Sequence, residues 1–137
     1  MTMSRHNAIL AASLLAFAGA LAGDGFYIDG PNPRAWANGA GLLAFGWFGL
    51  FDGTYAWLAN PALLAAWMLF HTSRAAWSAF AAALALALML SFLAATSIIT
   101  NEAGGRAAIT AHGLGYWSWL ASAAIMLAGA VLVRARA

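Results

Sequence analysis

The sequence contains no cysteine and no lysine, and few charged side chains of any kind. Without cysteine the chain has neither disulfides nor thiolate chemistry. Only 7% of its 137 residues are charged, whereas 64% are hydrophobic; a typical soluble domain is about 25% charged. So few charges cannot cover the surface of a soluble domain of this length. The hydrophobic surface is therefore expected to face a lipid bilayer, which is the first predicted partner.

The basic residues are scattered arginines rather than a patch. Nucleic-acid binding requires clustered positive charge on one face, so no nucleic-acid partner is expected. Abundant alanine and arginine without lysine is typical of a high-GC bacterial genome and, together with the hydrophobicity, predicts a bacterial inner-membrane protein. The six basic residues are Arg5, Arg34, Arg74, Arg106, Arg134 and Arg136.

Long apolar segments predict an all-α membrane protein with a single domain covering residues 1–137. The polar segments 24–38 and 100–112 are expected to be loops because glycine, asparagine and acidic residues are frequent there. The first apolar segment also has the outline of a secretory signal peptide, with a cleavage site at Ala20-Leu21-Ala22. Retention as a helix is the preferred interpretation, and removal of residues 1–22 stays open. The four predicted transmembrane helices cover about residues 3–23, 54–72, 75–99 and 113–133.

The apolar block of residues 39–72 is too long for one membrane span. As a single helix it would extend about 51 Å, whereas the hydrocarbon core is about 30 Å thick. The pairs Asp52-Gly53 and Asn60-Pro61 are expected to interrupt it, because glycine loosens the backbone and proline removes a hydrogen-bond donor. We therefore expect an interfacial or re-entrant helix over about residues 35–51, a turn at Asp52-Gly53, and a following span that Pro61 kinks. Whether residues 35–51 cross the membrane stays open.

The arginines also predict the orientation in the membrane. With four spans and both termini cytoplasmic, four arginines lie on the cytoplasmic side, which agrees with the positive-inside rule. A five-span chain with an external N-terminus agrees equally well. In the preferred four-span interpretation the cytoplasmic arginines are Arg5, Arg74, Arg134 and Arg136.

Residues Gly46–Pro61 read GWFGLFDGTYAWLANP, in which the pattern GWFG-x-x-x-G-x-x-AWLANP is distinctive. This pattern resembles a GWxGxxxGxxAWLANP-type motif shared by a family of small uncharacterised bacterial inner-membrane proteins. The resemblance extends weakly to Gly113-Leu114-Gly115-Tyr116-Trp117. It implies location and architecture, and it carries over no activity and no catalytic residue.

Asp52 is the one carboxylate inside a hydrophobic block. Acids within a membrane often belong to ion or proton paths, but Asp-Gly is also a strong turn pair, and the turn interpretation is preferred. His6 and His71 are expected at one face, where two imidazoles can ligate a haem; interfacial histidines are the preferred interpretation. No metal-site spacing or nucleophile–base pattern occurs, so no metal, cofactor, catalytic residue or enzymatic activity is expected.

Small residues are abundant in every predicted span, and they let membrane helices approach closely. The leading prediction is therefore an accessory or interaction subunit of a larger integral-membrane complex that docks through small-residue helix packing. One alternative is a small homo-oligomeric transporter or channel with Asp52 at a broken helix. Another is a haem- or quinone-associated electron-transfer subunit. The residues predicted to serve packing or partner binding are Gly46, Trp47, Gly49, Gly53, Trp57, Asn60, Pro61, Gly113 and Gly115.

Overall fold

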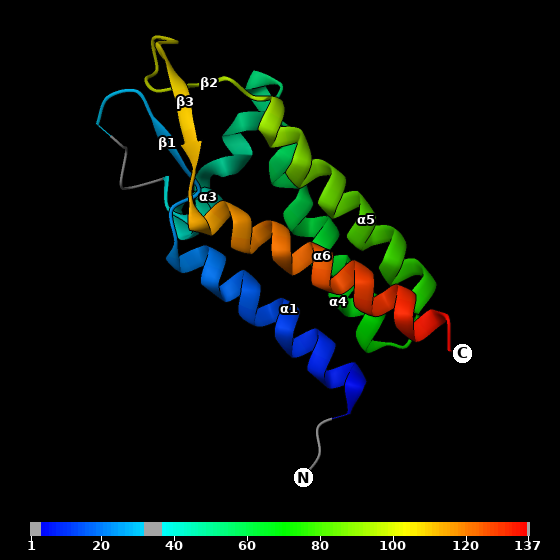
Figure 1. Cartoon of the computed structure of the whole chain (residues 1–137). Helices are drawn as coiled ribbons and strands as arrows, with labels where there is room; N and C mark the ends of the chain where they lie inside the picture. The colour runs from blue at the N-terminus through cyan, green and yellow to red at the C-terminus, as the bar shows by residue number, and fades with distance from the viewer. Residues whose placement is uncertain (1–3, 32–36, 137) are drawn as a thin grey trace.

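The computed structural model describes residues 4–31 and 37–136, and Met3, Arg34 and residues 35–36 of the predictions above lie outside them. Four longer helices lie side by side in the described part of the chain, with a small sheet at one end (Figure 1). The four longer helices are α1 (Arg5–Ala22), α4 (Ala59–His71), α5 (Ala75–Ser91) and α6 (Leu114–Arg134), and a shorter helix, α3 (Gly39–Phe45), precedes α4. Short 3-10 helices are η1 (Gly46–Asp52), η2 (Ala56–Leu58) and η3 (Phe92–Ala94), and the strands are β1 (Phe26–Ile28), β2 (Ser97–Ile99) and β3 (Arg106–His112).

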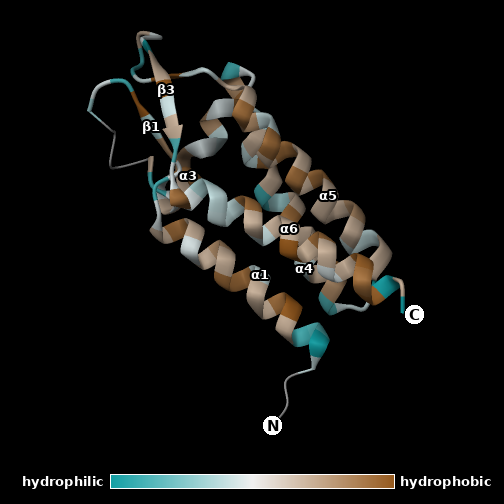
Figure 2. Ribbon diagram, viewed as in Figure 1, coloured by the Kyte–Doolittle hydropathy of each residue, from teal (hydrophilic) through white to brown (hydrophobic). Residues whose placement is uncertain are grey.

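Three helices are long and apolar enough to cross a membrane: Arg5–Ala22, Ala75–Ala94 and Leu114–Arg134. Hydrophobic residues follow these helices along most of their length (Figure 2). α4 has 13 residues and extends roughly 20 Å, which is short of a hydrocarbon core of about 30 Å. The prediction of a membrane-spanning protein is therefore supported by three helices, whereas the predicted span over residues 54–72 is not confirmed.

The all-α prediction is wrong at one end of the molecule. Both polar segments that were predicted to be loops contribute to a three-stranded antiparallel sheet with strand order β1-β3-β2. Phe26 of β1 lies opposite His112, and Ser97 of β2 lies opposite Ala108. The predicted span over residues 75–99 consequently ends early, since its last three residues form β2.

A tight hairpin explains why this part of the chain leaves the helix. Residues 96–100 read Thr-Ser-Ile-Ile-Thr, and β-branched side chains of this kind favour strands over helices. Thr100 N donates to the carbonyl oxygen of Gly105 (2.7 Å), and the Asn101 side chain accepts from Gly105 N (2.8 Å). Gly104 has φ +82, a left-handed conformation that glycine adopts without strain. The hairpin therefore satisfies the backbone groups that a continued helix would otherwise pair.

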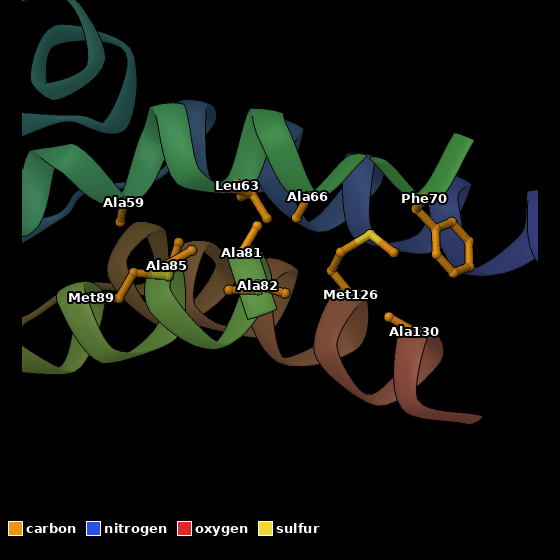
Figure 3. Packing of buried hydrophobic residues seen from close by; sticks show 11 residues of the cluster. Ala59, Leu63, Ala66, Phe70, Ala81, Ala82, Ala85, Met89, Met126 and Ala130 are labelled. Atoms are coloured by element: carbon orange, nitrogen blue, oxygen red, sulfur yellow. The ribbon is translucent and has the colours of Figure 1, made fainter. Parts of the chain in front are cut away.

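The core lies between α4, α5 and α6, where Leu63 and Phe70 of α4 face the other two helices (Figure 3). α5 contributes mainly alanine to it, so that the neighbouring helices approach closely. The prediction that Pro61 kinks a helix is wrong. α4 begins at Ala59, so Pro61 lies in its first turn, where a backbone N–H has no partner within the helix. The buried cluster comprises Ala59, Leu63, Ala66, Phe70, Ala81, Ala82, Ala85, Met89, Ala123, Met126 and Ala130.

α1 and α6 pack against each other through small residues. A Cβ atom added at Gly115 would lie 2.6 Å from the carbonyl oxygen of Gly23 and 2.7 Å from that of Asp24. Further along, Ser13 Oγ donates to the carbonyl oxygen of Ser122 (2.7 Å) and accepts from Trp67 Nε1 (2.8 Å). The buried Ser13 hydroxyl therefore joins α1, α4 and α6, and both of its hydrogen bonds are made inside the protein.

The two ends of the described chain lie together, at the end of the helices opposite the sheet (Figure 1). There the His6 ring stacks on Phe70 with centroids 4.0 Å apart, so the start of α1 lies against the end of α4. Arg106 belongs to β3 at the other end of the molecule. The cytoplasmic location of both termini stays a prediction. It requires both ends of the chain to lie at the same end of the helices, as they do here.

Candidate functional site

A cavity of about 110 Å³ lies beneath the sheet, between α1, α3, η2 and the first turns of α4 and α6. Its wall is apolar and strongly aromatic, and no charged residue lines it. Ring-bearing residues come from five different segments of the chain, so that the cavity exists only where these segments meet. The aromatic lining residues are Phe17, Phe26, Trp57, Phe92, Tyr116 and Trp119.

Hydrogen bonds to the protein hold the polar rings of this wall in place. Trp57 Nε1 donates to the carbonyl oxygen of Leu43 (3.0 Å), and the Tyr116 hydroxyl donates to the carbonyl oxygen of Met89 (2.8 Å). Trp119 Nε1 donates to Asn60 Oδ1 (2.9 Å), which connects α6 to the start of α4. The wall is therefore preorganised, because each of these donors already has a partner within the chain.

The structure brings four of the predicted residues together around the cavity: Gly46, Trp57, Asn60 and Gly115. Gly46 leaves room for the indole, because a Cβ atom there would lie 2.9 Å from Trp57 Cδ1. Gly113 lies next to this site, where its N–H donates to the carbonyl oxygen of Gly25 (3.0 Å) and its Cα faces the Asp24 backbone. The remaining predicted residues lie outside the cavity: Trp47, Gly49, Asp52, Gly53 and Pro61.

A groove of about 330 Å³ adjoins the cavity and shares Phe17, Leu43, Trp57 and Asn60 with it. Pro61 and two further residues of α4, Leu64 and Trp67, complete its wall. Beside the groove, Trp67 Nε1 donates to Ser13 Oγ of α1 (2.8 Å), and the Trp67 ring meets Phe17 edge to face at 5.2 Å. α1 and α4 therefore touch at one end and leave a hollow between them at the other.

Asp52 forms an ion pair with Arg106. Arg106 Nη1 donates to both carboxylate oxygens, at 2.8 and 3.0 Å, while Nε and Nη2 donate to the Ser97 hydroxyl and carbonyl oxygens at 2.9 and 3.1 Å. The hydrogen bond to Asp52 raises the pKa of the Arg106 guanidinium. Both side chains are partly exposed, so the pair stabilises the fold little. It connects η1 to the hairpin between β2 and β3.

Five large aromatic residues around η1 point outward, and we call them the aromatic face. Trp47 and Phe48 stack with ring centroids 4.0 Å apart, and Trp47 meets Phe51 edge to face at 6.3 Å. At the end of η1, Gly53 has φ +75, which closes the turn toward η2. The members are Phe45, Trp47, Phe48, Phe51 and Tyr55, and their side chains are 39–84% exposed.

The predicted haem ligands have other surroundings. The ring of His6 stacks on Phe70, and His71 is an exposed residue at the end of α4. His112 lies in β3 against Phe92 and Tyr116, and its Nε2 atom is buried without a partner among the described residues. Burial lowers the pKa of His112, so its imidazole is neutral at neutral pH. Within residues 4–31 and 37–136, no three histidine or carboxylate side chains gather as a metal site.

Comparison with known proteins adds no assignment to this geometry: no family model, no curated protein and no solved structure matches the chain. The chain is a small, mostly helical protein with three helices able to cross a membrane and an antiparallel sheet at one end. The resemblance of Gly46–Pro61 to a family of small membrane proteins stays a prediction.

Proposed function

We propose that this protein is an accessory subunit of a larger integral-membrane complex and that it docks on its partner through the aromatic face. The observation that supports this proposal is the set of exposed, mutually stacked aromatic rings around η1. Large exposed apolar patches mark surfaces of protein–protein or membrane contact. Tryptophan, tyrosine and phenylalanine are also enriched in the cores of protein interfaces.

The chemistry of the aromatic face favours a protein partner over lipid headgroups. Tryptophan and tyrosine suit the headgroup region because they combine an apolar ring with a polar edge. Three members of this face are phenylalanines, and Trp47 Nε1 already donates to the carbonyl oxygen of Ala44 (3.0 Å). The aromatic face therefore exposes mainly apolar ring surface with few free hydrogen-bond donors. Because the Asp52–Arg106 pair and the Gly53 turn hold η1 in place, little conformational entropy is lost when it docks.

Several small residues of the chain serve packing within it, although others, such as Ala83 and Ala87 of α5, are exposed. Gly115 contacts Gly23, and a Cβ atom at Gly39 would clash with the Ala20 carbonyl group. Ala82 and Ala85 of α5 are fully buried in the core. We therefore place the docking surface on the aromatic face, while small-residue packing holds the subunit together.

Removing two rings of the aromatic face is expected to release the partner. In mild detergent, the double variant Phe48→Ala/Phe51→Ala should recover about tenfold less of the co-purifying membrane protein, as loss of an interface anchor of about 1.4 kcal/mol predicts. Phe80→Ala is the matched control, because Phe80 is 65% exposed on α5, outside the aromatic face. Its yield of the partner should equal that of the unaltered chain.

Three results would contradict the docking proposal. Equal losses in the control and in the double variant would show that the aromatic face has no special role. A lone oligomer, with an ion flux that Asp52→Asn removes, would favour the transporter or channel alternative. A Soret band in the purified protein would favour the haem-associated alternative.

A further inference from the structure

The cavity and the groove adjoin each other through four shared lining residues, and we call the two together the hollow. The cavity holds about 110 Å³, and for comparison an apolar cavity of about 150 Å³ in another protein binds benzene. It is therefore of the order of one six-membered ring, and its wall consists mainly of aromatic rings. The groove is larger and is lined by Leu43, Pro61 and Leu64, which suits an extended apolar chain.

Asn60 lies where the cavity meets the groove, since it lines both. Its orientation follows from Trp119: an indole N–H can only donate, so the atom of Asn60 that faces it is the oxygen. The amide NH₂ therefore points elsewhere, and within the described part of the chain it has no acceptor. The group is only half-buried and is not one of the buried polar groups without a partner, so it is free to donate to an occupant that brings an acceptor.

Thr54 also lines the cavity, and its hydroxyl group has no hydrogen-bond partner among the described residues. The other donors of the wall, on Trp57, Tyr116 and Trp119, are already used inside the protein. No carboxylate, histidine, lysine or arginine lines the cavity or the groove. A charged headgroup would therefore be left unpaired there, whereas a neutral carbonyl would find a donor.

From these observations we propose that the hollow binds one neutral lipophile with a carbonyl-bearing ring in the cavity and an apolar tail in the groove. This is the chemistry of a prenylated quinone. An acyl chain alone would fill the groove but would leave the Asn60 amide without an acceptor. The proposal concerns binding and includes no electron transfer. It goes beyond the docking role and uses a different surface, so either can fail without the other.

Titration of the purified protein with a decyl-substituted benzoquinone, in nanodiscs of phosphatidylcholine, tests this site. Binding should quench the fluorescence of Trp57 and Trp119 and should saturate at one molecule per chain. Asn60→Asp keeps an oxygen for Trp119 but replaces the donating NH₂, so the dissociation constant should rise at least about tenfold. Asn7→Asp, at an exposed position in the first turn of α1, is the matched control and should leave it unchanged.

A second variant, Thr54→Leu, tests the same site in case Asn60→Asp does not fold. Thr54→Leu fills part of the cavity, and the Thr54 side chain has no hydrogen bond to lose, so it should also weaken binding about tenfold. Size-exclusion profiles and circular dichroism report whether each variant is folded. Quenching that rises without saturation, as for a quinone dissolved in lipid, would overturn the proposal. Unchanged affinity in both folded variants would do the same.

Discussion

Gly115→Ala is expected to lower the free energy of unfolding by about 1–3 kcal/mol, the usual cost of overpacking. The added methyl group would meet the carbonyl oxygens of Gly23 and Asp24 at 2.6 and 2.7 Å. Both are backbone atoms that cannot rotate away, so α1 and α6 must separate locally. Gly115 N also donates to the carbonyl oxygen of Asp24 (2.8 Å), and this hydrogen bond would lengthen.

Thermal unfolding in detergent micelles, followed by circular dichroism, measures this effect. Gly49→Ala is the matched control, because the nearest atom to its added methyl group is Thr54 O at an ordinary 3.4 Å. The control should unfold within a few degrees of the unaltered chain. If both variants unfold at the same temperature, the close crossing of α1 and α6 is not a determinant of stability.

Phe70→Ala is expected to destabilise the protein by about 3 kcal/mol, the lower end of the range for a buried phenylalanine. Phe70 is fully buried and stacks on His6, at the end of the bundle where α1 and α4 touch. In lipid the transfer of the ring from water contributes little, but the cavity that remains still loses its dispersion contacts. The variant should therefore loosen α1 from α4.

Met68→Ala is the control for Phe70→Ala, because Met68 belongs to the same helix and is exposed. Limited proteolysis near residue 5 and thermal unfolding should both report faster opening in Phe70→Ala alone. Equal behaviour of the two variants would contradict the position of α4 inside the bundle.

Hydrophobic runs in the sequence predict the helices well, and polar composition predicts the sheet poorly. α1 and α5 each lie within a predicted span, and α6 extends one residue beyond the span predicted over residues 113–133. β1 and β2 have only three residues each, too few for a visible alternation of polar and apolar positions. Phe26 also pairs with His112, and no local signal reports a partner so distant in the sequence.

Four of the residues predicted for packing or partner binding line the cavity, but neither the cavity nor their arrangement around it was predicted. The motif draws attention to Gly46, Trp57 and Asn60, whereas their convergence with Gly115 depends on how α6 crosses the chain. The aromatic face was missed because the segment was expected to be one helix of 3.6 residues per turn. As a 3-10 helix, η1 has three residues per turn and presents its rings in a different direction.

Cysteine accessibility tests the central claim most directly, namely that the bundle crosses the bilayer with the sheet on one side and both termini on the other. The chain has no native cysteine, so any labelling comes from the cysteine that is introduced. Single cysteines are placed at four exposed positions: 29, 73, 103 and 136. Positions 29 and 103 lie at the sheet end and should react with an impermeant thiol reagent in intact cells. Positions 73 and 136 should react only after permeabilisation. Labelling of position 73 in intact cells, together with positions 29 and 103, would contradict the account.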